Sequence, residues 1–298
     1  MSTPSLAKIW WKTLRPATLW AGATPAIVGA AVAFGLARRD LAVAHVGLAF
    51  AALACALLLQ IGCNLINDYE DFARGADTPD RLGPARATAQ GWLTGRQVLS
   101  VAVGALGLAL VLGLWAATLR GWPLVAIGVA GLGAAVAYTA GPFPLGYKGL
   151  GDLFVMIFFG FAATAGTCFA VTGTWSAEAL LAGYALGALA TAILVVNNLR
   201  DRHTDARANK RTLAVRFGER FARRQYAVLV VSAFVAAGVG AAVFQRPGWL
   251  LPLLAIPLAI RELAALRTVD GAALNPHLGA TARLELLFGL LLSVGVLL

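Results

Sequence analysis

The sequence predicts an all-α integral membrane protein with a cytoplasmic N-terminus, and three observations support this prediction. Of its 298 residues, 59% are hydrophobic and only 13% are charged, whereas soluble proteins carry roughly 25% charged residues. Nine apolar stretches are long enough, or nearly so, to cross a bilayer. Finally, the 24 Lys and Arg residues are distributed very unevenly between the connections on the two sides of these stretches.

Most of the nine stretches approach the ~20 residues that a helix needs to cross the hydrocarbon core. In order, they are residues 17–36, 41–66, 97–118, 122–140, 152–172, 178–199, 226–245, 248–266 and 279–298. The first follows Lys8 and Lys12 and is too long for the apolar core of a typical signal peptide, so we expect it to span. The third is preceded by Thr94, which forms a capping-box pattern with Gln97.

The uneven distribution of Lys and Arg predicts how the helices are oriented in the membrane. If the N-terminus is cytoplasmic, the N-terminal segment and the connections after the even-numbered helices hold all Lys and Arg residues except four, Arg38, Arg39, Arg120 and Arg246. Cytoplasmic loops of membrane proteins carry such an excess. It accounts for the net charge of +10, and no soluble module is present to bind nucleic acid. We therefore expect a multi-pass protein of a bacterial plasma membrane.

Cysteine and histidine usage makes two kinds of site improbable. Cys55, Cys63 and Cys168 lie in apolar stretches without the spacing of a disulfide framework. The three histidines are scattered, which argues against a zinc site. The long inner connections, residues 67–96 and 200–225, are better candidates, because long loops in compact domains usually carry function.

Two acidic motifs begin these connections. Residues 64–71 read NLINDYED and residues 197–205 read NNLRDRHTD. In each motif an Asn precedes an Asp by four residues, and a further Asp follows after three or four. If the helices continue, Asn64, Asp68 and Asp71 lie along one face, as do the corresponding residues of the second motif. Both motifs follow even-numbered helices, so they emerge on the same side of the membrane. The two halves of the chain resemble a diverged repeat within one domain, residues 1–298.

Two facing Asp clusters are suited to binding a diphosphate through Mg²⁺, which is typically held by one or two carboxylates together with substrate phosphates. The alternative is a solvated helix end with local ion pairs, for example between Glu70 and Arg74. No EF-hand loop is present to favour calcium. A substrate that combines a diphosphate with a need for a membrane is a polyprenyl diphosphate. Aromatic faces would stabilise its allylic cation, and Tyr69 and Tyr138 lie near the right level.

The chain resembles the UbiA-type intramembrane prenyltransferases over nearly its whole length. The resemblance rests on five segments: LRPATLWAGATPAIVG (14–29), NLINDYEDFARGADTPDRLGPAR (64–86), YTAGPFPLGYKGLGDLFVMIFFG (138–160), NNLRDRHTDARANKRTLAVRFG (197–218) and LNPHLGATARL (274–284). The two Asp-rich segments are the most specific. Parts of the second, third and fourth segments resemble the branch that prenylates 1,4-dihydroxy-2-naphthoate in menaquinone synthesis.

This resemblance implies nine helices around a central cavity and Mg²⁺-dependent transfer of a polyprenyl group to dihydroxynaphthoate. Decarboxylation would follow and give a demethylmenaquinol. The substrates would be a polyprenyl diphosphate and a small aromatic acid, and no obligate protein partner is evident. The family motif matches Asn67, Asp68 and Asp71, but Gly75 stands where the motif has its last Asp, so Asp77 is a candidate replacement.

The resemblance and the motifs together give the expected site. The metal-ligating residues are Asn67, Asp68, Asp71, Asp77, Asp201 and Asp205, of which Asp68, Asp71, Asp201 and Asp205 are also the catalytic residues. The substrate-binding residues are Asn64, Arg81, Arg86, Tyr138, Tyr147, Lys148, Asp152, Asn197, Lys210 and Arg211.

Each of these assignments has a structural alternative. The Asn residues suit helix packing, the basic residues suit a cytoplasmic surface, and the tyrosines suit an interfacial belt. Lys148 and Asp152 could instead pair with each other. Two functional alternatives also stay open: the same transfer to a hydroxybenzoate or homogentisate type of acceptor, and a cation-coupled transporter with intramembrane carboxylates.

Overall fold

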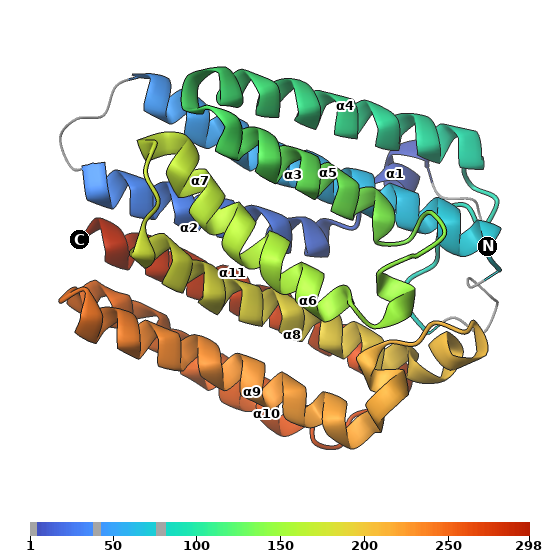
Figure 1. The fold of residues 1–298 in the computed structure, drawn as a ribbon. Helices are drawn as coiled ribbons and strands as arrows, with labels where there is room; N and C mark the ends of the chain where they lie inside the picture. Colours follow the sequence, from blue (N-terminus) through green and yellow to red (C-terminus); the bar gives the residue numbers. More distant parts are fainter. Residues whose placement is uncertain (1–4, 38–42, 76–81) are drawn as a thin grey trace.

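A computed structural model describes residues 5–37, 43–75 and 82–298, and all regular secondary structure in these residues is helical (Figure 1). The elements in order are α1 (Leu6–Leu14), α2 (Pro16–Ala37), α3 (Val43–Ala73), α4 (Gly95–Arg120), α5 (Trp122–Ala137), η1 (Gly146–Lys148), α6 (Gly151–Val155), η2 (Met156–Ala162), α7 (Ala163–Thr172), α8 (Ala177–Arg207), α9 (Leu213–Val243), η3 (Pro247–Ala255), α10 (Ile256–Ala265), η4 (Gly271–Leu274) and α11 (Asn275–Leu297).

Within the described residues, eight helical segments are long and apolar enough to cross a membrane. Three of them combine consecutive elements: α6 with η2 and α7, η3 with α10, and η4 with α11. The ninth expected span corresponds to α5, which has 16 residues and ends at Ala137 rather than residue 140. Pro142 and Pro144 follow closely, and two such prolines remove backbone N–H donors and clash with the preceding turn, which favours an end to the helix.

Both acidic motifs are helical, which extends the helices beyond the expected spans. The expected spans end at residues 66 and 199, whereas α3 continues to Ala73 and α8 to Arg207. Similarly, α9 begins at Leu213 rather than near residue 226. Thr212 caps it, since its hydroxyl accepts a hydrogen bond from the Val215 N–H at 3.3 Å. A break at Gly218, with φ of 80°, separates this first turn from the rest of α9.

The expected capping box at the start of α4 is confirmed. The Gln97 N–H donates to the Thr94 hydroxyl at 3.3 Å, and the Thr94 N–H donates to the Gln97 side chain at 2.9 Å.

The helices form an elongated bundle in which α8 has the most buried position. Leu186, Leu189 and Leu199 of α8 are fully buried, and α8 packs against α2, α9, α11 and η2. At Gly160 of η2, an added Cβ would lie 2.6 Å from the Gly183 carbonyl oxygen of α8. Small residues therefore let these two backbones approach closely, as in other membrane helix pairs.

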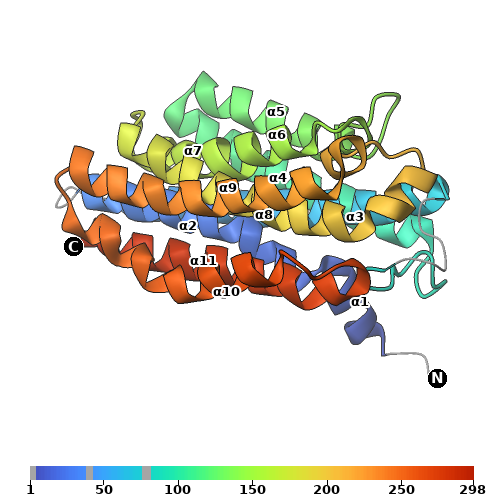
Figure 2. The same cartoon turned by 90° about the horizontal axis from the view of Figure 1, so that it is seen from below.

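Figures 1 and 2 show that the C-terminal ends of α3 and α8 lie at the same end of the bundle as the N-terminal helix α1. The C-terminus of the chain lies at the opposite end. The fold therefore brings the two acidic motifs, which are more than a hundred residues apart in the sequence, to one end of the bundle.

Candidate active site

A cavity of about 870 Å³ enters the bundle, and both acidic motifs line its polar end. Asn64, Asn67, Asp68 and Asp71 come from α3, and Asn197, Asp201 and Asp205 come from α8. Deeper in the bundle the wall is apolar, with side chains such as Leu59, Leu132, Phe154 and Phe158. The cavity thus combines a polar end with an interior suited to a hydrocarbon chain.

The α3 carboxylates are buried and are held by groups from neighbouring loops. Asp68 is 1% exposed and accepts a hydrogen bond from the Thr88 hydroxyl at 2.6 Å. Asp71 is 3% exposed, accepts from the Tyr147 hydroxyl at 2.8 Å and pairs with Arg86 at 3.3 Å. Because each carboxylate has a fixed donor, its direction is set before a ligand binds.

The α8 carboxylates have basic neighbours within their own segment. Both oxygens of Asp201 accept hydrogen bonds from Arg200, at 2.5 and 2.8 Å. Asp205 Oδ1 lies 3.5 Å from Lys210 Nζ. The other Asp205 oxygen is buried and accepts no hydrogen bond in the described part of the chain, which is costly unless a ligand or water occupies the site.

The two acidic motifs act on each other across the cavity. Asp201 and Asp71 both interact electrostatically with Asp205. Tyr147 lies between the motifs: its hydroxyl donates to Asp71, and the Lys210 ammonium lies over its ring at 5.6 Å. Burial and the nearby Asp71 carboxylate raise the pKa of the Tyr147 phenol, which therefore stays protonated and able to donate.

Most of the expected site residues line this cavity: Asn64, Asn67, Asp68, Asp71, Arg86, Tyr138, Asn197, Asp201, Asp205 and Lys210. Four others are not among the lining residues: Tyr147, Lys148, Asp152 and Arg211. Asp77 and Arg81 lie outside the described residues.

The four non-lining residues have other contacts. Lys148 lies over the Phe143 ring at 5.3 Å, while Asp152 accepts a hydrogen bond from the Gln225 amide at 2.9 Å. The expected alternative of a Lys148–Asp152 pair is therefore not what these side chains form. The Arg211 side chain is exposed, and its backbone N–H donates to the Tyr147 carbonyl.

The local ion pair expected as an alternative is also present. Arg74 and Glu70 pair at 3.3 Å on the exposed side of α3, whereas Asp68 and Asp71 face the cavity. Of the two tyrosines considered for cation stabilisation, Tyr138 lines the cavity and Tyr69 packs beside Gly95.

Several residues at the polar end were not expected from the sequence. Thr88, Asn198, Arg200 and Asn275 contact the acidic residues or line the cavity. Nothing around Thr88 in the sequence points to Asp68. Arg200 precedes Asp201 directly, but basic residues are common in cytoplasmic loops, so its position alone did not single it out.

The potential metal ligands at the polar end of the cavity fit Mg²⁺ in part. Among the described residues, no three His, Cys, Asp or Glu side chains gather closely enough to hold a metal ion by themselves. The carboxylate and carboxamide oxygens are hard ligands of the kind that Mg²⁺ prefers, and Mg²⁺ usually takes its remaining ligands from water and substrate phosphates. The unpartnered Asp205 oxygen offers one such ligand.

The sequence matches the UbiA prenyltransferase family over residues 22–274. It is 37% identical to the 1,4-dihydroxy-2-naphthoate octaprenyltransferase of Escherichia coli K12, over 99% of this chain and 96% of the relative. It is 38% identical to the Mycobacterium tuberculosis protein of the same name, over 88% of this chain and 87% of the relative.

Solved structures agree on the fold. The apo UbiA homolog from Aeropyrum pernix K1 has a TM-score of 0.70 at 16% identity and covers 95% of this chain and 98% of its own. A UbiA homolog from Archaeoglobus fulgidus, bound to GPP and Mg²⁺, has a TM-score of 0.61 at 17% identity, covering 96% and 99%. Because the family match extends over most of the sequence, the chain belongs to the UbiA prenyltransferase family.

Proposed function

We propose that the chain transfers a polyprenyl group from polyprenyl diphosphate to 1,4-dihydroxy-2-naphthoate, with loss of carbon dioxide, in menaquinone synthesis. The observation that carries this proposal is the cavity, whose polar end is lined by two pairs of Asp residues and whose interior is apolar. The names of the bacterial relatives, which match over nearly their whole length, support the choice of acceptor.

The residues at the polar end hold the diphosphate. Asp68, Asp71, Asp201 and Asp205 are the proposed metal ligands, with Asn67 and Asp77 as further candidates. Bound Mg²⁺ would neutralise the charge that develops on the departing pyrophosphate. Arg86 and Lys210 line the same end of the cavity, where their charge favours the phosphate oxygens.

The apolar wall accommodates the prenyl chain and keeps water from the allylic carbon while its bond to oxygen breaks. Tyr138 lines the cavity, and an added Cβ at Gly151 would lie 3.0 Å from its hydroxyl oxygen. The tyrosine is thus seated against the start of α6, where its ring can stabilise the developing cation. The aromatic acceptor then attacks the allylic carbon and no covalent enzyme intermediate is needed.

We also propose that α5 crosses the membrane as the ninth span and that the N-terminus and the site face the cytoplasm. The charge asymmetry of the loops supports this orientation. The chain would form one domain, residues 1–298, in which α3 and α8 are equivalent helices of a diverged repeat. Their matching motifs and their parallel course in the bundle support this relation.

A different aromatic acceptor is the main alternative, because the cavity does not by itself select one ring. The transporter alternative has no support from the family match or from the curated relatives.

The test is to incubate membranes that contain the protein with a prenyl diphosphate, Mg²⁺ and each candidate aromatic acid, and to identify the product by mass. We expect the decarboxylated prenyl naphthalenediol with the naphthoate and little product with hydroxybenzoate or homogentisate. Efficient transfer only to one of the other acids would contradict the proposed acceptor.

The metal assignment has its own test. Asp68→Asn and Asp201→Asn should each reduce Mg²⁺-dependent transfer at least about 100-fold, since electrostatic stabilisation of the leaving group is lost. The amount of folded protein extracted from the membrane should not change. Full activity in either variant would rule that residue out as a required ligand.

A further inference from the structure

The guanidinium of Arg200 lies buried in the wall of the candidate site. Arg200 is not among the site residues expected from the sequence. Its side chain is almost completely enclosed, since the residue is 2% exposed, yet it lines the polar end of the cavity. It donates two hydrogen bonds to Asp201, from Nε to one carboxylate oxygen at 2.8 Å and from NH2 to the other at 2.5 Å. Arg200 thus binds both oxygens of a proposed metal ligand.

Two carboxamide oxygens hold the same guanidinium in place. NH2 also donates to Asn197 Oδ1 at 2.7 Å, and NH1 donates to Asn275 Oδ1 at 2.9 Å. Asn275 in turn donates to the Leu82 carbonyl at 2.8 Å. An added Cβ at Gly83 would lie 2.7 Å from NH2, so the loop before α4 closes directly over Arg200.

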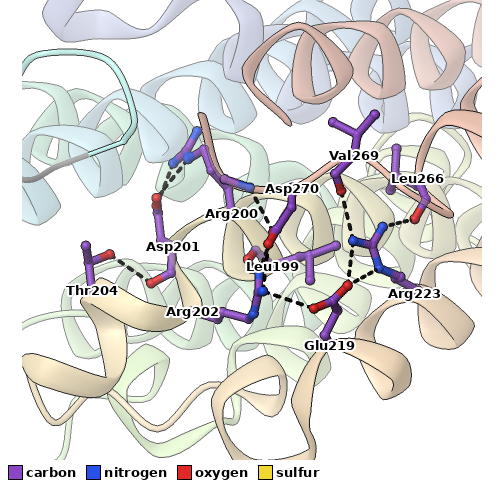
Figure 3. Close-up of polar contacts among 11 residues, drawn as sticks. Leu199, Arg200, Asp201, Arg202, Thr204, Glu219, Arg223, Leu266, Val269 and Asp270 are labelled. Atoms are coloured by element: carbon purple, nitrogen blue, oxygen red, sulfur yellow. Dashed lines mark hydrogen bonds and ion pairs between the residues drawn. The ribbon is translucent and has the colours of Figure 1, made fainter. Parts of the chain in front are cut away.

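Arg202, two residues further along α8, provides a direct contrast. Figure 3 shows Arg200 bonded to Asp201, whereas Arg202 turns to Asp270 and Glu219 and takes no part in the cavity wall. Both arginines belong to α8 and both pair with acidic side chains, but only the partner of Arg200 lines the cavity.

We propose that Arg200 is the counter-ion of Asp201 and competes with the divalent cation for it, so that this residue sets the metal affinity of the α8 half of the site. The proposal rests on the proposed function. The guanidinium occupies both oxygens of the carboxylate and offsets its negative charge, and the same positive charge opposes the approach of a second cation. Asp201 becomes fully available to a metal only when Arg200 releases it.

The diphosphate gives Arg200 a replacement partner. A guanidinium matches the geometry of phosphate oxygens, to which it donates two parallel hydrogen bonds. Asn197 and Asn275 keep the group at the cavity wall while it changes partner. Arg200 therefore links metal binding to diphosphate binding: the empty site binds metal weakly, and the diphosphate favours metal binding by drawing the guanidinium away from Asp201.

The test measures binding of Mn²⁺, as a spectroscopic substitute for Mg²⁺, to purified protein by electron paramagnetic resonance, with and without inorganic pyrophosphate. Without pyrophosphate, Arg200→Gln should bind Mn²⁺ about tenfold more tightly than the wild type, because the competing charge is gone. Its KM for prenyl diphosphate should rise, because the phosphate contact is also gone. Arg200→Gln should also show a smaller increase in Mn²⁺ affinity on addition of pyrophosphate.

Arg202→Gln is the matched control and should leave Mn²⁺ affinity unchanged, with or without pyrophosphate. If Arg200→Gln does not yield folded protein, Arg200→Lys is tested in its place. A single ammonium cannot bind both Asp201 oxygens as the guanidinium does. Mn²⁺ should therefore bind to Arg200→Lys more tightly than to the wild type. Equal or weaker Mn²⁺ binding in the folded Arg200 variants would overturn the proposal. If the wild type neither binds Mn²⁺ nor transfers prenyl groups, the proposed function itself fails.

Discussion

At the level of single residues, every candidate metal ligand of the Asp type that the structure describes has a neighbouring donor. Asp68 accepts a hydrogen bond from Thr88, and Asp71 accepts one from Tyr147 and pairs with Arg86. Asp201 pairs with Arg200, and Asp205 pairs with Lys210. Asp68, Asp71 and Asp205 are buried, and a buried carboxylate without such partners would carry a large desolvation cost. The donors thus offset part of this cost and fix the directions of the carboxylates.

Tyr147→Phe tests one of these donors. The variant loses the hydrogen bond to Asp71, and we expect kcat/KM for prenyl transfer to fall roughly tenfold, since a hydrogen bond to a charged group contributes about 1.5–3 kcal/mol before water replaces part of it. The pKa of the Tyr147 phenol is raised by burial, so the wild type keeps this proton across the assay range. The loss should therefore be equal from about pH 6 to pH 9.

Tyr226→Phe is the control for the removal of a buried hydroxyl. Tyr226 contacts Thr281 at 3.0 Å, and neither residue lines the cavity. Its activity should stay within about twofold of the wild type. Equal losses of activity in both variants would show that removing a buried hydroxyl disturbs packing in general, and that the hydrogen bond from Tyr147 to Asp71 has no special role.

The sequence singled out the acidic residues of the candidate site, but not Thr88, Arg200 or Asn275, which lie beside them. Asp68, Asp71, Asp201 and Asp205 stand out because they interrupt apolar stretches with a repeated spacing. Thr88 and Asn275 have no such pattern, since each reaches the site only through the folding of a loop or a helix start. Contacts between distant segments leave no local trace in a single sequence.

At the level of elements, glycines determine how closely the C-terminal helices pack. An added Cβ at Gly240 of α9 would lie 2.1 Å from the fully buried ring of Trp249 in η3. The Trp249 indole N–H donates to Glu178 at the start of α8 at 2.9 Å. This tryptophan therefore joins three elements at the end of the bundle away from the candidate site.

We expect Gly240→Ala to lower the free energy of unfolding by about 1–3 kcal/mol, because the new methyl group overpacks the Trp249 site. Gly238→Ala, in the same helix, is the matched control: no atom lies within 4 Å of its added Cβ, and alanine is the better helix former. Thermal unfolding in detergent measures both. A Gly240 variant as stable as the Gly238 variant would show that Trp249 can move without cost.

Two arginines, Arg202 of α8 and Arg223 of α9, bind the loop between α10 and η4 (Figure 3). Asp270 pairs with Arg202, and Arg223 donates to the Val269 carbonyl at 2.9 Å. The hydrogen bond and charge of Arg202 lower the pKa of Asp270 to about 2. A lowered carboxyl pKa stabilises the fold above the ordinary value of about 4 and loses that effect as the pH falls through the folded value.

Asp270→Asn should therefore lower stability at neutral pH by less than about 1 kcal/mol, since the pair is partly exposed and screened. The difference from the wild type should shrink as the pH falls from about 4 toward 2. Unfolding of both proteins in detergent over this pH range provides the comparison. A difference that stays constant with pH would mean that Asp270 acts through its shape and not through its charge.

Helix positions were predicted better than helix ends. The apolar stretches correspond to helices throughout, because hydrophobicity marks the part of a helix that faces lipid or the core. The polar turns of α3, α8 and α9 that extend beyond this part were placed in the connections, and a helical continuation was considered only for the two acidic motifs. Their helical form depends on packing at the end of the bundle and on the Thr212 cap, which hydropathy does not report.

For the whole molecule, the main expectation was that the two acidic motifs meet at one end of one cavity, and the structure has this arrangement. It follows from topology: α3 and α8 both run toward the same end, so their C-terminal turns share a side. The side of the membrane on which that end lies depends on the charge asymmetry of the loops.

The orientation can be tested by placing single cysteines at the two ends of the bundle, in a variant that lacks Cys55, Cys63 and Cys168. Ala206→Cys at the end of α8 and Thr174→Cys between α7 and α8 are both at exposed positions. In intact cells, a membrane-impermeant maleimide should label only the cysteine at 174. In inverted vesicles it should label only the cysteine at 206, because the proposed orientation places the acidic end on the cytoplasmic side. The reverse pattern would mean that the acidic end of the cavity faces the outside, and it would overturn the proposed orientation.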